Sequence, residues 1–162
     1  MKDGYTADEL FEIAEDIERE GEVFYKRAAK HTRKVASRKL YLDLAADEKQ
    51  HRQLFRQMRK KMATQDESSL LRKPDRTISL YLRLVAKGSV FQAPRARKGG
   101  VTLPEAETDI VRLAVQKELE SLLYYCGMQG LLVDDEARAV LDAIMKEERE
   151  HIAALAIHHK LA

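Results

Sequence analysis

Apolar residues recur along most of this chain at steps of three and four, the spacing of one face of an α-helix. These steps predict four long helices and one short helix. The short helix is predicted near 77–87, where Ile78, Leu82 and Val85 repeat at helical spacing before Gly88. It lies in a connection, about 63–104, that holds all three prolines and a Gly99-Gly100 pair. The four long helices are predicted at about residues 6–31, 37–62, 105–128 and 135–159.

Local signals mark several of the helix ends. Thr6 and Glu9 match a capping box, in which a hydroxyl and a carboxylate satisfy free backbone N–H groups. The stretch 102–105 is a second predicted helix start, and Asp134 or Asp135 is expected to cap the last helix. The third long helix is expected to end where Gly127, Gln129 and Gly130 interrupt it.

The order of long and short connections predicts the topology. Short links make helices antiparallel neighbours, whereas the long connection 63–104 lets the third long helix start from the same end as the second. An antiparallel four-helix bundle with one such crossover is of the ferritin-like type. We therefore expect an all-α, ferritin-like fold that forms a single domain over residues 1–162.

The two halves of the chain carry the same stripe of residues at an offset of 100 positions. On the first and third long helices the stripes are Phe11, Ala14, Glu18, Gly21, Tyr25 and Ala28, and Val111, Ala114, Glu118, Ser121, Tyr125 and Met128. On the second and fourth they are Tyr41, Leu44, Glu48, His51, Phe55 and Met58, and Leu141, Ile144, Glu148, His151, Leu155 and His158. Each half thus places one Glu, then Glu-x-x-His, in an otherwise apolar stripe.

These polar interruptions predict a metal site. Ionised carboxylates in an apolar core cost several kcal/mol each, and four of them near one level would repel one another. Two divalent cations would balance the four charges, with two neutral imidazoles as further ligands. Such oxygen and nitrogen donors suit iron or manganese and also accept zinc. The alternative is a bundle in which these polar groups face solvent or pair with each other.

The motifs on all four long helices resemble those of the rubrerythrin branch of the ferritin-like superfamily. They are Glu18-Arg-Glu-Gly-Glu-Val-Phe-Tyr25, Asp47-Glu48-Lys-Gln-His51, Glu118-Leu-Glu-Ser-Leu-Leu-Tyr-Tyr125 and Glu147-Glu148-Arg-Glu-His151. The resemblance implies two iron ions in a non-haem site that reacts with hydrogen peroxide or dioxygen. By the same resemblance, Glu48 and Glu148 would bridge the metals, Glu18 and Glu118 would be terminal ligands, and His51 and His151 would each cap one iron. No catalytic residue beyond these ligands is expected.

The chain departs from the family pattern in two respects. Full-length rubrerythrins carry a rubredoxin-like module with four cysteine ligands, but this chain has one cysteine, so an external donor such as a rubredoxin-like protein is expected. Ser121 occupies the position of an additional acidic ligand, which makes the predicted site more symmetric. We expect a homodimeric di-iron oxidoreductase that reduces peroxide or dioxygen. A ferroxidase in iron storage or detoxification, and a non-enzymatic metal-binding bundle, are the alternatives.

Four residues near the predicted ligands are candidates for supporting roles. Tyr25 and Tyr125 follow the first- and third-helix glutamates by two turns, where they could hydrogen-bond a ligand carboxylate, supply an electron, or simply fill the core. Asp47 and Glu147 could accept the outer N–H of the opposite histidine, or could be surface acids. The lone Cys126 is expected to be a packed thiol.

Composition limits the other function classes. The formal charge of +2 and the lack of aromatic residues among the basic ones argue against nucleic-acid binding. No apolar run is long enough to span a membrane, and the charged N-terminal stretch lacks a signal peptide's apolar segment, so a cytoplasmic location is expected. The basic part of the connection, 71–98, could dock an acidic electron donor or be a solvated crossover. Its basic residues are Arg72, Lys73, Arg76, Arg83, Lys87, Arg95, Arg97 and Lys98.

Overall fold

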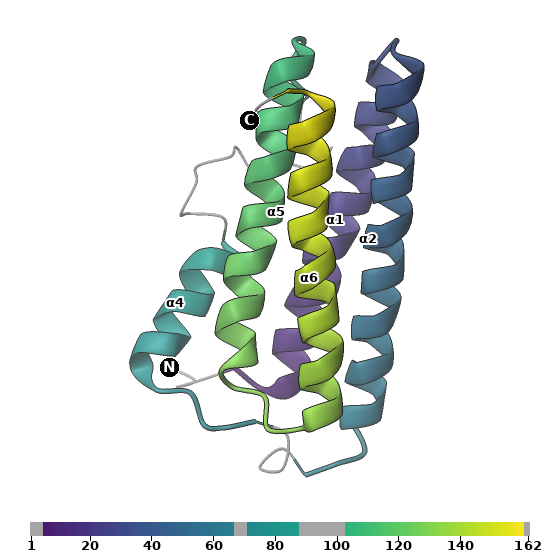
Figure 1. Cartoon of the computed structure of the whole chain (residues 1–162). Helices are drawn as coiled ribbons and strands as arrows, with labels where there is room; N and C mark the ends of the chain where they lie inside the picture. Colours follow the sequence, from purple (N-terminus) through teal and green to yellow (C-terminus); the bar gives the residue numbers. More distant parts are fainter. Residues whose placement is uncertain (1–4, 67–70, 88–102, 161–162) are drawn as a thin grey trace.

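The computed structural model describes residues 5–66, 71–87 and 103–160, and the regular secondary structure of these ranges is helical (Figure 1). A single isolated bridge in these ranges joins Leu71 to Leu132, between the start of the crossover and the link that follows the third long helix. The all-α prediction is confirmed. The helices are α1 (Ala7–His31), α2 (Val35–Met62), α4 (Arg76–Ala86), α5 (Glu107–Gln129) and α6 (Asp135–His158).

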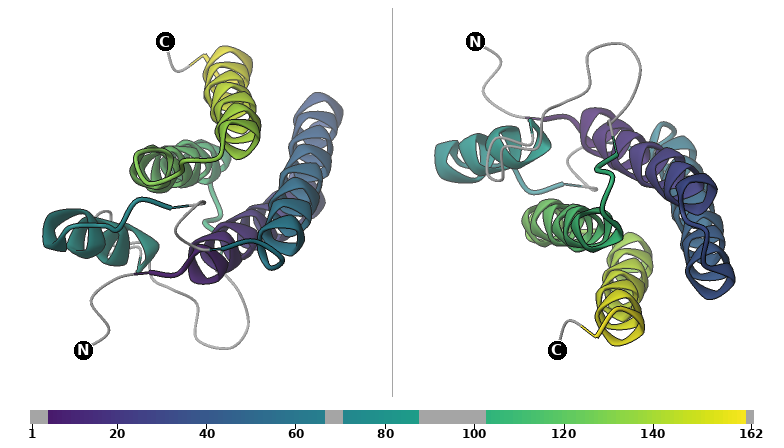
Figure 2. Two further views of the ribbon diagram at one scale, coloured as in Figure 1. Left: turned by 90° about the horizontal axis from the view of Figure 1, so that it is seen from below. Right: turned by 90° about the horizontal axis from the view of Figure 1, so that it is seen from above.

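The long helices form two hairpins that pack side by side. Helix α1 packs against α2 and α5, while α6 packs against α5 and α2. Helices α2 and α5 both begin at the end of the bundle where α1 and α6 finish, as the long crossover predicted (Figure 1). Helix α4 lies outside the four, against α5, in both end views of Figure 2.

The helix ends follow local capping chemistry where the sequence supplies it. The Thr6 hydroxyl accepts from the backbone N–H of Glu9 at 3.1 Å, and the Glu9 carboxylate accepts from the N–H of Thr6 at 2.9 Å, which completes the capping box. Asp134 caps α6 by accepting from the N–H of Ala137 at 2.7 Å. Helix α5 begins at Glu107, later than predicted, and its N-cap residue, Ala106, makes no side-chain capping hydrogen bond.

Helix α5 ends at Gln129, within one residue of the predicted end, with Gly130 as its C-cap, but Gly127 itself lies inside the helix and serves packing. Helix α5 continues through it to Gln129. A Cβ atom at Gly127 would lie 2.6 Å from the ring of Tyr81 and 2.8 Å from Leu82, both on α4. The Tyr81 hydroxyl also donates to the carbonyl of Leu123 at 2.6 Å. The missing side chain therefore lets α4 approach the backbone of α5.

The core consists of two apolar clusters with a polar layer between them. One cluster includes Phe11, Phe55, Tyr124, Tyr125 and Met128, and the other includes Phe24, Tyr25, Tyr41, Val111 and Leu155. Every predicted stripe residue is buried except His158, which lies in the last turn of α6. Its ring reaches the Ser37 hydroxyl, 3.1 Å away, at the exposed end of the bundle. None of the helices in the described ranges combines the length and apolar character that crossing a bilayer requires.

We predict that Gly127→Ala lowers the free energy of unfolding by about 1–3 kcal/mol, because the added methyl group would overlap the side chains of Tyr81 and Leu82 on α4. Gly130→Ala is the matched control. A Cβ there meets only the carbonyl oxygen of Gly127, at 3.7 Å, so its stability should stay within about 0.5 kcal/mol of the parent. Urea denaturation measures both, and equal stability of the two variants would contradict this account of the α4–α5 contact.

Candidate metal centre

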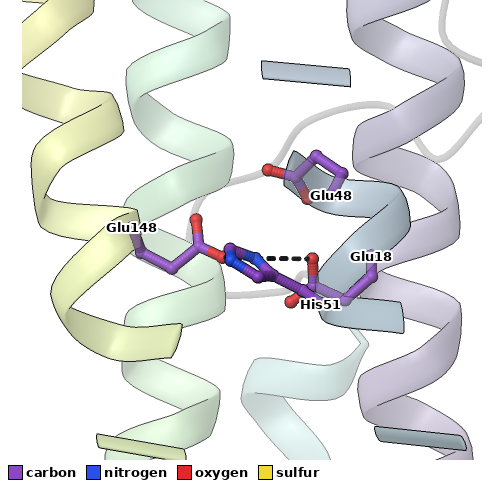
Figure 3. A group of neighbouring side chains, drawn as sticks. All are labelled: Glu18, Glu48, His51 and Glu148. Atoms are coloured by element: carbon purple, nitrogen blue, oxygen red, sulfur yellow. Dashed lines mark hydrogen bonds and ion pairs between the residues drawn. The ribbon is translucent and has the colours of Figure 1, made fainter. Parts of the chain in front are cut away.

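Six ionisable side chains from the four long helices meet in the polar layer between the two apolar clusters. Four of them are drawn in Figure 3, where the ring of His51 lies between the side chains of Glu148 and Glu18, and Glu48 lies above it in the view. All six are buried, and none exposes more than 5% of its surface. They are Glu18 on α1, Glu48 and His51 on α2, Glu118 on α5, and Glu148 and His151 on α6.

The six residues divide into two overlapping groups. Glu18, Glu48, His51 and Glu148 form one group, and Glu48, Glu118, Glu148 and His151 form the other. Within each group, one donor atom from every residue lies within 4.8 Å of the others. Glu48 and Glu148 belong to both groups, which is the position that the resemblance assigns to bridging carboxylates.

Both histidines direct Nδ1 into the layer and Nε2 out of it. Nδ1 of His51 lies 3.0 Å from Glu148, and Nε2 lies 2.8 Å from the Glu147 carboxylate. Nδ1 of His151 lies 3.3 Å from Glu148, and its Nε2 lies 3.4 Å from Asp47. The predicted contacts of both outer acids with the opposite histidine are therefore present. An acid at Nε2 keeps the proton there and leaves the Nδ1 lone pair for a ligand.

The two tyrosines hydrogen-bond crosswise between α1 and α5. The hydroxyl of Tyr25 donates to Glu118, and the hydroxyl of Tyr125 donates to Glu18. Both rings are buried at 1% exposure or less. Each tyrosine therefore holds the carboxylate of the other half of the repeat, a pairing that the sequence spacing alone does not specify.

Gly21, a member of the inward stripe of α1 to which the sequence assigned no role, lies against the carboxylate of Glu48. A Cβ atom at this position would lie 2.4 Å from Oε2 of Glu48. Since Gly21 is in the middle of α1, where glycine is unfavourable, it is retained at some cost to the helix. A glycine inside a helix, on the inward stripe and one turn after Glu18, was the signal available in the sequence.

Without cations, protons take up the charge of the layer. Burial raises the pKa of Glu48 and Glu118 well above the ordinary value, and neighbouring carboxylates raise it further. Burial alone would also raise the pKa of Glu148, but its interactions with the neighbouring Glu118 and with both histidines lower it. Burial alone would lower the pKa of His51, but its bonds to Glu148 and Glu18 raise it to about 11. The metal-free layer is thus a set of shared protons.

The layer lacks the partners that other buried glutamates have. Glu15 and Glu22, also on α1, pair with Arg56 at 3.1 Å and Arg52 at 2.9 Å. In the layer, four buried atoms have no hydrogen-bond partner among the described residues, namely Oε2 of Glu18, Oε1 of Glu48, Oε2 of Glu148 and Nδ1 of His151. Unsatisfied buried atoms of this kind are costly. Their chemistry, three carboxylate oxygens and one imidazole nitrogen, fits a pair of divalent cations.

The remaining candidates from the sequence lie elsewhere. Cys126 is exposed, which corrects the prediction of a packed thiol, because its side chain falls on the outer face of α5. In the basic connection, Arg72, Lys73, Arg76, Arg83 and Lys87 lie within the described residues, whereas Arg95, Arg97 and Lys98 lie outside them.

Comparisons with known proteins agree with this geometry. The model of the rubrerythrin family matches residues 9–158. A crystal structure described as that of a ferritin-like diiron-carboxylate protein from Thermotoga maritima aligns with a TM-score of 0.64 and 21% identity, over 96% of this chain and 95% of that one. At that identity the likeness shows the fold, and it confirms the ferritin-like class. A comparison with curated protein sequences gave no match.

We predict opposite pH dependences for the metal-free and metal-loaded protein. A group with a raised pKa in the folded state stabilises the fold below its unfolded pKa and loses that contribution as the pH rises. For His51 this loss runs from pH 6.5 towards 11, and for Glu48 and Glu118 it begins above pH 4.5. The melting temperature of the metal-free protein should therefore fall between pH 6.5 and about pH 9.

Metal loading should reverse this trend, because ligands must lose their protons to bind a cation. The stabilisation by added Mn²⁺ or Fe²⁺, measured anaerobically by thermal unfolding, should grow over the same pH interval. In Glu48→Gln both slopes should be smaller. A metal-free melting temperature that rises with pH would contradict the proton-sharing layer.

We also predict that Gly21→Ala weakens metal binding by about 10- to 100-fold, the range found when residues that orient ligands are changed. The new methyl group would displace the carboxylate of Glu48. Ser121→Ala, at the equivalent position of the other half, is the control, because it removes only a hydroxyl that donates to the carbonyl of Lys117. Competition of Co²⁺ between the protein and a coloured chelator measures both affinities, and equal affinities would refute the role of Gly21.

Proposed function

The chain belongs to the rubrerythrin family, and on that premise we propose that it is a non-haem di-iron oxidoreductase that reduces hydrogen peroxide, or dioxygen, with electrons from an external donor. The observation that carries this proposal is the layer of six buried donor residues, in which four buried atoms have no hydrogen-bond partner in the part of the chain that the structure describes. Four carboxylates and two imidazoles match the charge and the ligand preference of two Fe²⁺ ions.

Each residue of the layer has a distinct part in holding the ions. Glu48 and Glu148, which are common to both groups, would bridge them. Glu18 and Glu118 would each be a terminal ligand, fixed by the tyrosine hydroxyl from the opposite helix. His51 and His151 would each cap one ion through Nδ1.

Two bound iron ions would supply the two electrons that cleave the O–O bond. The overall reaction, H₂O₂ + 2H⁺ + 2e⁻ → 2H₂O, requires a donor that returns those electrons. The protein's own contribution is to hold the carboxylates at fixed positions and to keep bulk water out. The apolar clusters above and below the layer serve the second purpose, since Phe11, Phe55 and Leu155 are fully buried.

A ferroxidase is the second candidate, and Ser121 is the observation that favours it. Its hydroxyl donates to the backbone of its own helix, so it adds no carboxylate to the layer. The resulting set of six donors is close to symmetric, as in iron-storage proteins. The expected homodimer and the nature of the external donor remain predictions.

We predict that the reduced, iron-loaded protein is oxidised faster by peroxide than by dioxygen when the two are compared by stopped-flow absorbance at equal concentrations. Glu48→Ala and Glu148→Ala should each abolish two-metal loading, because each removes a carboxylate common to both groups. Glu150→Ala, an exposed residue that pairs with Lys146 on the same helix, is the control and should load normally.

Two results would contradict this function. Faster oxidation by dioxygen with accumulation of a ferric core would identify a ferroxidase. Two irons per chain in either Glu48→Ala or Glu148→Ala would remove the basis for the bridging assignment.

A further inference from the structure

The outer side of the α5–α6 hairpin is apolar at positions that are charged in the first half of the chain. On α5 these positions are 115, 119, 122 and 126, whose steps of four and three place them along one face of the helix. On α6 they are 152 and 156, about one turn apart. We call this set the outer α5–α6 face, and it consists of Val115, Leu119, Leu122, Cys126, Ile152 and Ala156.

The equivalent residues of the first half, 100 positions earlier, are all charged, namely Glu15, Arg19, Glu22, Lys26, Arg52 and Arg56. Glu15 on α1 pairs with Arg56 on α2 at 3.1 Å. Glu22 pairs with Arg52 at 2.9 Å in the same way. These ion pairs join the two helices of the α1–α2 hairpin and give its outer side a polar surface. All six positions therefore change from charged to apolar between the halves, although both halves supply the same types of ligand to the layer inside.

The part of the chain that the structure describes leaves the outer α5–α6 face uncovered. In both end views of Figure 2, none of the drawn helices covers the side of α5 and α6 that faces away from α1 and α2. Leu119, near the middle of α5, is 43% exposed, and Cys126 is exposed as well. Val133, in the link that follows α5, is also 43% exposed. A helix that carries apolar residues beyond its inward stripe normally buries them, so we expect a partner to cover this face.

The size of the outer α5–α6 face matches the contact area of a second protein copy. Helix α5 has 23 residues, so at 1.5 Å per residue it is about 35 Å long. Two neighbouring helices with axes about 10 Å apart present a face about 20 Å wide, which gives an area of about 700 Å². A stable protein–protein contact covers about 800 Å² on each partner. The face is thus large enough for a dimer and much larger than a small ligand needs.

The charges near the face favour a copy of the same chain over a strongly charged partner. The exposed charged residues on and beside it are Asp109, Arg112, Arg138, Asp142, Lys146, Arg149 and Glu150. Arg112 pairs with Asp109 at 3.1 Å on α5, and Lys146 pairs with Glu150 at 3.5 Å on α6. Because the two signs are nearly balanced, neither an acidic nor a basic partner would be strongly attracted. A second copy brings the same balance of charge and an apolar stripe of the same length.

We propose that two copies of this chain associate through their outer α5–α6 faces, about a two-fold axis that passes near Leu119. A two-fold axis lets the same patch on each copy cover the other, so no apolar patch stays open to further copies. The Leu119 side chains then lie at the centre of the contact, where a charge is most costly. The α1–α2 hairpins, with their ion pairs, face solvent on the two outer sides of the dimer. The proposal does not depend on the di-iron function, because the face lies on the opposite side of the hairpin from the metal-binding layer.

Analytical ultracentrifugation over a range of protein concentrations tests the association, and the parent should sediment as a dimer. Leu119→Arg introduces the residue type that the first half carries as Arg19. Its dissociation constant should be higher by about 30-fold or more, because a charge would be buried at the centre of the contact. Val23→Arg is the matched control. Val23 is 42% exposed but lies on α1, so this variant should keep the dissociation constant of the parent.

A second variant keeps the test valid if Leu119→Arg does not fold. Leu122→Glu/Ile152→Arg places in the second half the ion pair that Glu22 and Arg52 form in the first. Because the α1–α2 hairpin holds that pair at the equivalent positions, the variant should fold, with the circular dichroism spectrum of the parent. It should nevertheless be monomeric at concentrations at which the parent is dimeric, since its outer α5–α6 face carries charge.

The reactivity of Cys126 tests the location of the contact. Cys126 is the one cysteine of the chain, and it is exposed in a single copy. Its rate of reaction with a maleimide should fall as the protein concentration rises and the dimer forms, both in the parent and in Val23→Arg. In Leu119→Arg the rate should stay high at every concentration.

Four results would overturn the proposal. The first is a parent that stays monomeric at the highest concentration reached. The second is a dimer, or a larger assembly, that a folded Leu119→Arg or Leu122→Glu/Ile152→Arg leaves intact. The third is dissociation of Val23→Arg to the same extent as Leu119→Arg. The fourth is a Cys126 that reacts equally fast in the dimer and in the monomer.

Discussion

The burial of four carboxylates and two imidazoles in one layer is the constraint on which the rest of this fold depends. The layer separates two apolar clusters of buried side chains. Hydrogen bonds and shared protons offset part of the cost of burial, but four donor atoms find no hydrogen-bond partner within residues 5–66, 71–87 and 103–160. Such an arrangement is unfavourable for a purely structural protein, since apolar residues of similar volume are often more stabilising than buried charge. A pair of cations is the compensation that these particular donors can accept.

The helix pattern and the position of the layer could be predicted from sequence, because both depend on spacing along single helices. The stripes with Glu18, Glu48, His51 and their counterparts required only that the four helices face one axis. The crosswise bonds of Tyr25 and Tyr125 could not be predicted, because they depend on how far α1 and α5 are shifted along each other. The same reason applies to the packing role of Gly127, because it depends on the position of α4 against α5.

The departures from the twofold repeat are as informative as the repeat itself. Gly21 faces Glu48, while the equivalent residue, Ser121, keeps its hydroxyl on its own helix. Tyr41 continues a row of rings, while Leu141 does not. The repeat supplies each type of ligand twice, whereas the positions that differ between the halves give the two sets of ligands different neighbours.

The claim that the layer holds two metal ions is tested most directly by anomalous diffraction from crystals of the iron-loaded protein, recorded at the iron absorption edge. Two peaks are predicted between the carboxylates of Glu48 and Glu148, one beside Nδ1 of His51 and the other beside Nδ1 of His151. A layer with no peak, a single peak, or peaks confined to the protein surface would contradict the account.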